Sequence, residues 1–467
     1  MSVLDPSAFT VDSLSSAFAD GTLSPVDVTA ACLARIEQLD GELNAFVRVD
    51  SEGALTAARE SEERWNTGQQ RGPLDGVPTT IKDTMALLGW PTLKGSRQVD
   101  PAKVATEDSP SAARLKDEGV VILGKTCVPE FAWKGCSDSP LTGLTRNPWN
   151  PERTAGGSSA GAAVAAATGM SVLNTGTDGG GSVRMPAGFC SVVGLKPTFA
   201  IVPIYPPSTG GLLSHVGPLT RTVRDAAHMM AAMARPDDRE LFPSVADERS
   251  WLDGIDDGVA GLRIAFSPAY GSAQVDPQIA AATRAAAETF ATLGATVVEE
   301  DPDVPSSRDE FLAIWDAMLA RTLKDLPADR LADSDPGLVA TMERGLRISA
   351  QQLLDAEGIR SLVTLGFNRQ LRDYDVLISP QLPVVAFPFG SDVADPATQV
   401  HWVDWTPFTY PHNISRLPAV AVPMGLSIEG LPMSLQIVGR HFDDRLVLRV
   451  ARALELAQPF PVLSYAS

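Results

Sequence analysis

Apolar residues recur at helical spacing near the start of the chain. Four of them fall on one face of a helix: Val28, Cys32, Ile36 and Leu39. Residues 24–27 (Ser-Pro-Val-Asp) just before them form a helix start, because serine caps, proline suits the first turn and aspartate completes a capping box. The pattern predicts a helix from Ser24, followed by a charged surface helix at 51–65.

The clearest alternation of strand and helix comes after residue 260. Gly261 to Phe266 and Ala295 to Glu299 have the composition of strands, and Asp276 to Leu293 between them has helical spacing. Asp276 can cap this helix and Gly294 can stop it. We expect a β-α-β unit here.

Short apolar runs predict further strands at 43–49, 79–81, 120–126, 172–175, 192–196, 375–380, 419–423 and 432–438. Strands that alternate with helices indicate an α/β fold with a mostly parallel or mixed sheet. The acidic segment 235–260 is typical of a surface linker, but the β-α-β unit after it can extend the same sheet. We therefore expect one domain over residues 1–467, with a variable, mainly helical region at 303–370 that shapes the pocket.

The composition is that of a globular protein, with 467 residues, 44% hydrophobic and 20% charged. A net charge of −19 disfavours nucleic acid and anionic membranes as partners. The first ten residues lack the basic and apolar parts of a secretory signal, and no apolar run reaches membrane-spanning length. These features favour a cytoplasmic protein without membrane contact.

The chain has four cysteines without a C-x-x-C pair, which predicts free, mostly buried thiols. Its five histidines show no spacing typical of metal ligands. We expect neither a metal nor a cofactor.

A glycine- and serine-rich stretch from Thr154 to Pro186 contains two candidate reactive hydroxyls, Ser158 and Ser182. Each follows glycines, which let a backbone approach a ligand and adopt positive φ. Three glycines before Ser182 can turn several N–H groups to one point, as a developing oxyanion requires. By itself, the stretch also fits a flexible loop, so both interpretations stay open.

Lys82 follows the strand-forming residues Thr79 to Ile81, so it lies at the end of a predicted buried strand. One interpretation is that its ammonium reaches solvent or pairs with Asp83. The other is a desolvated lysine of lowered pKa that can act as a base.

Residues 119–126 match the phosphate-loop pattern G-x-x-x-x-G-K-T. The four middle positions of such a loop must turn their N–H groups toward phosphate. Val120 to Leu123 are instead the best strand formers in this region, which favours a buried strand and a chance match.

Ordered blocks along nearly the whole chain together resemble the amidase signature family. They are Gly76-Val-Pro-Thr-Thr-Ile-Lys-Asp, Gly124-Lys-Thr with Glu130-Phe131, Thr145-Arg-Asn-Pro-Trp, Gly156-Gly-Ser-Ser, Gly176-Thr-Asp-Gly-Gly-Gly-Ser-Val-Arg, Gly217-Pro-x-x-Arg-Thr-Val-x-Asp, Phe408-Thr-Tyr-Pro with Asn413, Leu417-Pro-Ala, and Gly430-Leu-Pro-Met-Ser-Leu-Gln-Ile-Val-Gly. A lone G-G-S-S would be a weak signal, whereas this ordered set is specific. The resemblance implies a large mixed sheet flanked by helices on both faces.

The resemblance also implies a catalytic triad in which Ser182 is the nucleophile, Ser158 the bridging serine and Lys82 the base. It further implies a cis peptide bond between Gly157 and Ser158. A serine needs a base to become nucleophilic, and no histidine lies in these blocks, so a neutral lysine fits the need.

The remaining predicted roles surround this triad. The N–H groups of Gly179, Gly180, Gly181 and Ser182 are expected to hold the oxyanion. Asp178 and Arg184 are expected to pair and brace the loop, with Ser159 as a supporting hydrogen-bonding residue. By the same resemblance, substrate contacts the segment at Ala132 and Trp133.

The expected function is hydrolysis of a small-molecule carboxylic amide, and also of esters, aryl amides or carbamates, through an acyl-enzyme. One alternative is the glutaminase subunit of a tRNA-dependent amidotransferase, which needs partner subunits. Another is a nucleotide-binding protein that uses residues 119–126. Specificity stays open, because the pocket walls come from 200–214 and 303–370, and assembly stays open too, with a homodimer as one option.

Overall fold

The computed structural model describes residues 4–245 and 247–464, and residues 1–3, 246 and 465–467 lie outside that description. Parts of three predicted segments therefore lie outside the described residues. They are the ends of the domain predicted over 1–467, part of the N-terminal segment that was examined for a secretory signal, and one residue of the segment 235–260.

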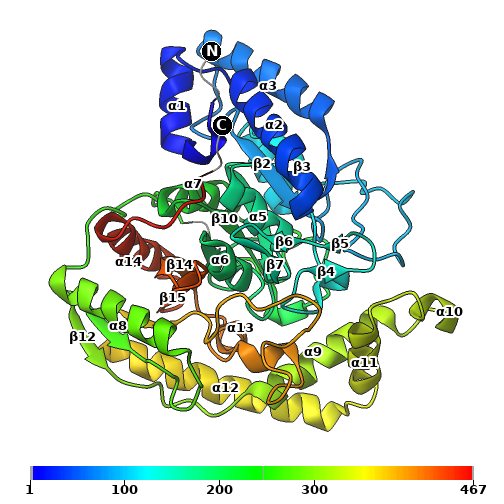
Figure 1. The fold of residues 1–467 in the computed structure, drawn as a ribbon, viewed down its shortest axis with the longest axis vertical. Coiled ribbons are helices and arrows are strands. Elements are labelled where there is room, and N and C mark those ends of the chain that lie inside the picture. The colour runs from blue at the N-terminus through cyan, green and yellow to red at the C-terminus, as the bar shows by residue number, and fades with distance from the viewer. Residues whose placement is uncertain (1–3, 246, 465–467) are drawn as a thin grey trace.

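A single mixed sheet organises the described chain (Figure 1). Its eleven strands follow the order β1-β3-β2-β8-β10-β9-β14-β15-β13-β11-β12. β2 runs parallel to β3 and β8, whereas β10, β14 and β15 pair antiparallel with their neighbours. The predicted α/β fold with a mixed sheet is confirmed. The strand bounds are β1 Phe46–Val49, β2 Pro78–Lys82, β3 Val121–Thr126, β8 Leu173–Asp178, β9 Val193–Lys196, β10 His215–Thr220, β11 Arg263–Phe266, β12 Thr296–Glu299, β13 Val376–Pro380, β14 Ala419–Leu426 and β15 Pro432–Gly439.

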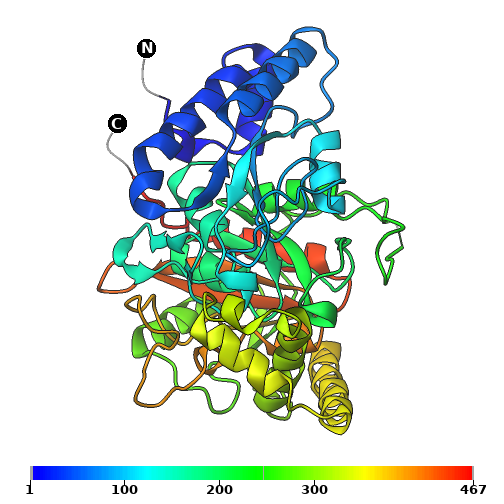
Figure 2. The ribbon, with the colours of Figure 1, turned by 90° about the vertical axis from the view of Figure 1, so that its right-hand side faces the viewer.

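Helices cover both faces of this sheet. Their bounds are α1 Val11–Asp20, α2 Pro25–Leu43, α3 Ser51–Asn66, α4 Pro110–Asp117, α5 Ala160–Thr168, α6 Arg184–Cys190, α7 Val223–Met233, α8 Pro277–Thr292, α9 Arg308–Leu323, α10 Ala328–Leu331, α11 Pro336–Gly345, α12 Ala350–Asp373, α13 Pro411–Ile414 and α14 Asp444–Ala457. The helices α1–α3 lie at one end of the molecule and α9–α12 at the other, in both ribbon views (Figures 1 and 2).

Strand geometry explains the two covered faces, because successive side chains point to opposite sides. In β14, Val420 and Val422 join the apolar cluster that contains α7, α8 and α14. Ala421 between them joins the cluster that contains α2, α5 and α6. A third cluster joins α9, α11 and α12 to the strands β11 and β13.

Several local predictions are confirmed in detail. The capping box at the start of α2 is present, with Ser24 Oγ accepting from Asp27 N at 3.1 Å. β11, α8 and β12 form the expected β-α-β unit, and β11 joins the main sheet through β13. The sheet therefore continues across the segment 235–260. The division into domains itself stays a prediction.

Two elements near the glycine-rich stretch were not predicted. The helix α6 contains Pro186 and Gly188, and the strand β10 contains Gly217 and Pro218. Glycine and proline weaken the propensity for both element types, so local patterning hid them.

Four short strands complete the fold as two hairpins. The strands β4 (Asp138–Ser139) and β5 (Gly143–Leu144) form one short hairpin, and β6 (Arg146–Asn147) and β7 (Asn150–Thr154) form another.

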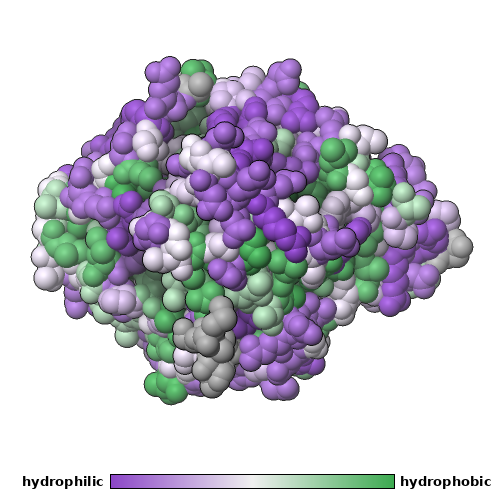
Figure 3. Space-filling model, turned by 90° about the horizontal axis from the view of Figure 1, so that it is seen from above, coloured by the Kyte–Doolittle hydropathy of each residue, from purple (hydrophilic) through white to green (hydrophobic). Residues whose placement is uncertain are grey.

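All four cysteines are free and buried, as predicted. In the described ranges, no helix combines the length and apolar character needed to cross a membrane. Hydrophilic side chains cover much of the face over the N-terminal helices (Figure 3).

The helix α5 is buried along its whole length, and one glycine permits its close approach to the residue before β1 and the residue after β3. A Cβ on Gly161 would meet Ala45 O at 2.1 Å and Cys127 N at 2.6 Å. Both neighbours are backbone atoms, so neither can turn aside.

We predict that Gly161→Ala lowers the free energy of unfolding by about 1–3 kcal/mol, as overpacking does. The matched control is Gly358→Ala in α12, where a Cβ meets nothing within 4 Å. That change should raise stability by about 0.5–1 kcal/mol, because alanine restricts the unfolded chain. Thermal unfolding midpoints of both variants test this, and equal shifts would contradict it.

Candidate active site

The predicted lysine and serines meet at one edge of the sheet. Lys82 ends β2, and Asp178 ends the neighbouring parallel strand β8. Neighbouring parallel strands present their C-terminal ends at the same edge, where α/β proteins place their sites. The N-terminus of α5, just after Ser158 and Ser159, lies at this edge too.

The amine of Lys82 is surrounded by hydroxyl groups. Its Nζ lies 2.8 Å from Ser158 Oγ, 2.8 Å from Ser159 Oγ and 2.8 Å from Thr177 Oγ1. It also lies 3.2 Å from the carbonyl oxygen of Thr177. In the described part of the chain, no carboxylate is bonded to this amine. The alternative pairing with Asp83 is excluded, because Asp83 pairs with Lys125 at 2.9 Å.

Burial decides the charge of Lys82. The side chain is 0% exposed, and this desolvation lowers its pKa well below the ordinary value. The negative charge of Asp178 acts in the opposite direction, but it is the weaker effect. A neutral amine has a free lone pair, which is what a general base needs.

The two motifs that carry Ser158 and Ser182 are joined by a backbone hydrogen bond. Ser159 N donates to the carbonyl oxygen of Ser182 at 3.1 Å, which ties the start of α5 to the second motif. The peptide bond Gly157–Ser158 is cis, as the resemblance implied. Ser158 and Ser182 both line a cavity of about 390 Å³.

The loop before Ser182 requires glycine for lack of space. A Cβ on Gly180 would lie 2.8 Å from the Phe311 ring. Gly181 has φ 126°, and its Cβ would lie 2.6 Å from Thr409 Oγ1. The N–H of Gly181 donates to Asp178 Oδ1 at 2.7 Å, so in this structure it is bonded to a carboxylate.

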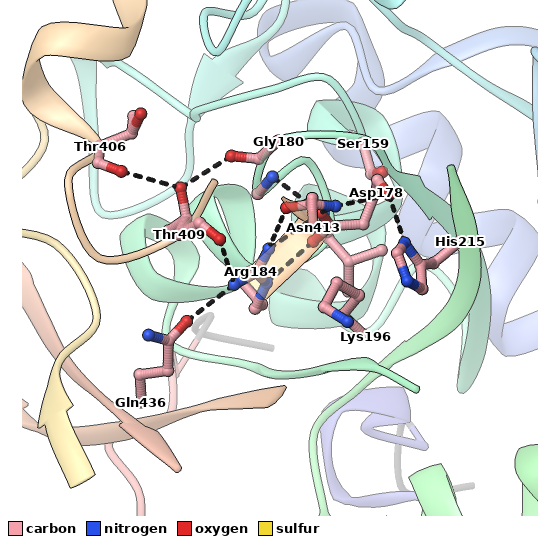
Figure 4. A network of polar contacts seen from close by, with 12 residues as sticks. Ser159, Asp178, Gly180, Arg184, Lys196, His215, Thr406, Thr409, Asn413 and Gln436 are labelled. Carbon is pink, nitrogen blue, oxygen red and sulfur yellow. Dashed lines mark hydrogen bonds and ion pairs between the residues drawn. The ribbon is translucent and has the colours of Figure 1, made fainter. Parts of the chain in front are cut away.

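A buried ion pair holds this loop (Figure 4). Arg184 Nε donates to Asp178 Oδ2 at 3.0 Å, and Arg184 Nη2 donates to Asp178 Oδ1 at 3.1 Å. Both side chains are 0% exposed. Burial by itself raises the pKa of Asp178, but the Arg184 guanidinium overcomes this and lowers it below the ordinary value. The predicted pairing is therefore present.

Residues distant in sequence complete the network around Arg184. Its other hydrogen bonds go to Thr409 O at 2.9 Å, Gln436 Oε1 at 2.8 Å and Asn413 Oδ1 at 2.7 Å. Asn413 Nδ2 donates in turn to Asp178 Oδ1 at 2.8 Å. Asn413 and Gln436 both lie in the blocks that resemble the family, but the sequence predicted no role for either.

His215 is a further residue that the sequence did not point to. Its Nδ1 lies 2.9 Å from Leu213 O and 3.2 Å from Asp178 O, so this nitrogen carries the proton and donates. Burial lowers the pKa of His215 well below the ordinary value and keeps the ring neutral. The strand β10 begins at His215. Because the sequence did not predict this strand, it did not predict the contact of His215 with Asp178 either.

The two predicted substrate-contact residues differ in position. Ala132 lines the cavity, and both it and Phe131 have positive φ, at 59° and 49°. Trp133 is not among the residues that line the cavity, and its contact with substrate stays a prediction. Its ring is buried against Gly337 of α11, where an added Cβ would lie 2.5 Å from it.

The chain is similar to known amidases over nearly its full length. A family model described as "Amidase" matches residues 27–448. An acylamidase of Rhodococcus erythropolis is 35% identical over 96% of this chain and 95% of its own. A glutamyl-tRNA(Gln) amidotransferase subunit of Myxococcus xanthus is also 35% identical, over 96% of both chains. The crystal structure of a bacterial aryl acylamidase of the amidase signature family superposes with a TM-score of 0.91, with 30% identity over 97% of this chain and 96% of that chain.

The chain belongs to the amidase signature family. Members of this family hydrolyse amides, and the amidase described here has the corresponding fold and reaction class.

The phosphate-loop match of the sequence can also be located in the structure. Residues 121–126 form the strand β3, and Lys125 of this stretch is buried against Asp83. The phosphate-loop match is therefore a strand, as predicted. No group of three or more histidine, cysteine or acidic residues suited to a metal occurs among the described residues.

We predict that Arg184→Met lowers stability by about 3–5 kcal/mol, because it leaves the buried Asp178 without its partner. The matched control is Arg284→Met, which breaks the exposed pair with Glu299 at 3.0 Å. That change should cost less than about 1 kcal/mol. Thermal unfolding compares the two variants, and a small effect of Arg184→Met would show that the pair does not hold the loop.

Proposed function

We propose that this amidase cleaves carboxylic amides through an acyl-enzyme on Ser182, with Ser158 as proton relay and Lys82 as base. The observation that carries the proposal is the buried amine of Lys82 at 2.8 Å from Ser158 Oγ. A lysine without a carboxylate partner, held neutral by burial, supplies the base that a serine nucleophile needs.

The proton path follows from this geometry. Ser182 Oγ attacks the carbonyl carbon while its proton passes to Ser158 and the proton of Ser158 passes to Lys82. When the tetrahedral intermediate collapses, Ser158 donates a proton to the leaving amine and regains one from Lys82. Water then attacks the acyl-enzyme through the same relay and releases the carboxylic acid.

The N–H groups of Gly179, Gly180 and Ser182 are the proposed donors to the oxyanion. Each such donor typically contributes about 2.7–4 kcal/mol to stabilisation of the transition state. Gly181 was also predicted to be a donor. Its N–H can take that role only if its bond to Asp178 opens or is shared.

Apolar side chains favour acyl or aryl groups as substrate. Phe131, Trp315, Met318 and Leu319 line the cavity together with the serines. Similarity to an aryl acylamidase supports aryl amides in particular. Esters and carbamates offer the same electrophilic carbonyl and are included in the proposal.

The second candidate function is that of a glutaminase subunit. The sequence identity to amidotransferase subunits favours this function. Free glutamine carries both a carboxylate and an ammonium group. The described cavity wall contains Lys94 and Lys103 but no aspartate or glutamate. An ammonium group would therefore lack an anionic partner, which disfavours glutamine.

Assembly as a homodimer and a cytoplasmic location stay predictions.

We predict that Ser182→Ala loses hydrolysis of a para-nitroanilide by about 10⁴-fold or more, as removal of a serine nucleophile does. Ser361→Ala is the control, since this serine lies on the exposed face of α12. The panel should include an ester, a carbamate and glutamine. Full activity of Ser182→Ala would refute the nucleophile assignment, and a preference for glutamine would favour the second function.

We predict that kcat/KM rises with pH through the lowered pKa of Lys82 and then levels off, because only the neutral amine accepts a proton. Acidification protonates Lys82 and removes the base. Lys82→Met should lose nearly all turnover over the whole pH range.

Lys196 gives a matched control for this pH profile. It is also a fully buried lysine with a pKa lowered by burial, but it donates to the backbone oxygen of Pro197 at 3.1 Å. Lys196→Met should keep the acidic limb of the profile. A Lys82→Met enzyme with the same profile as the parent protein would exclude lysine as the base.

A further inference from the structure

The charges in the cavity wall have one sign. Among the described lining residues, Lys94 and Lys103 are the only lysines or arginines, and none is acidic. This wall is positive inside a protein of net charge −19. Such a local reversal attracts an anionic group to the cavity.

Lys94 is held firmly in this wall by its backbone. Its N–H donates to Asp83 O at 3.1 Å, and its carbonyl accepts from Phe131 N at 2.7 Å. Asp83 follows Lys82, and Phe131 precedes Ala132, so both anchors are next in sequence to residues of the candidate site. Lys94 also has φ 54°, a conformation uncommon for a residue with a side chain. Because the backbone N–H and carbonyl of Lys94 are already hydrogen-bonded, only its side chain is available to bind a ligand in the cavity.

The ammonium of Lys94 has no hydrogen bond or ion pair with any described residue. Asp83, the acid whose charge acts on Lys94, is bonded instead to Lys125 at 2.9 Å and to Leu93 N at 3.2 Å. Burial lowers the pKa of Lys94, and the charge of Asp83 only partly offsets this. A partly desolvated cation without a partner gains more from an incoming anion than a solvated one does.

Lys103 is a second cationic residue in the wall of the same cavity. It is exposed, and it too lacks an ion pair with any described residue. The aromatic and aliphatic side chains of Phe131, Trp315 and Met318 line the same space. A substrate that combines an apolar body with one anionic end matches this wall.

We propose that Lys94, assisted by Lys103, binds a carboxylate carried by the substrate, so that the enzyme prefers amides and carbamates with a free carboxylate. This deepens and rests on the proposed hydrolase function. The carboxylate can belong to the acyl part or to the amine part of the substrate. A zwitterion such as a free amino acid is disfavoured, because the described wall has no anion for its ammonium group.

Two substrate pairs test the proposal and locate the carboxylate. In the first pair, para-acetamidobenzoate and para-nitroacetanilide differ at the amine part, where a nitro group replaces a carboxylate of similar shape. In the second pair, N-phenylsuccinamate and its neutral analogue with an isopropyl end differ at the acyl part. The value measured is the ratio of kcat/KM within each pair, which cancels any general change in turnover.

We predict that Lys94→Met lowers this carboxylate ratio by about 10- to 100-fold in at least one pair, as loss of a charge-assisted bond does. Lys94→Arg keeps the cation and should retain most of the ratio. Lys103→Met should have a smaller effect, since its ammonium is solvated. Lys324→Met is the control, because Lys324 lies outside the cavity and pairs with Asp325, and its ratio should equal that of the parent.

An unchanged ratio in Lys94→Met for both pairs would overturn the inference while leaving hydrolysis of the neutral amides intact. An equal fall in Lys324→Met would also overturn it, because the effect would then reflect overall charge. Failure of the proposed function looks different, since no member of either pair would then release its amine.

Discussion

The pair of Asp178 and Arg184 is the interaction on which the site depends. It joins the end of β8 to the start of α6, and its further bonds reach α13 and β15. Without the guanidinium, the carboxylate of Asp178 would be an uncompensated buried charge. That charge would favour the protonated form of Lys82, which Asp178 already influences. The ion pair therefore both shapes the serine loop and helps burial to keep the lysine neutral.

The position of Lys82 differs from that of a structural lysine. Lys125 on the neighbouring strand is also buried, but it has a carboxylate partner in Asp83. Lys134, another buried lysine, pairs with three acids, which raise its pKa although burial opposes this. Lys82 instead meets only hydroxyl and carbonyl oxygens. The nature of the partner, more than burial alone, separates the proposed base Lys82 from the ion-pair lysines.

The cavity combines this chemistry with a particular charge pattern. The glycine loop packs against Phe311 and the Trp315 ring, so the helical region 303–370 supports the loop of the proposed nucleophile as well as the pocket wall. Another part of the wall carries the unpaired Lys94. The groups of the proposed reaction and those of the proposed substrate preference thus meet in one cavity, although they come from different segments of the chain.

The sequence by itself determined the strands of the main sheet other than β10, several helices and the ordered motifs, because these depend on local periodicity and composition. Those motifs also pointed to Lys82, Ser158 and Ser182 as candidate catalytic residues. Only the tertiary structure decided that Lys82 has no carboxylate partner among the described residues, that Gly181 donates to Asp178 and that the Trp133 ring packs against Gly337. It also placed His215 and Asn413 beside Asp178. Such pairings join residues up to 235 positions apart, and a distance of that kind leaves no periodic signal in the chain.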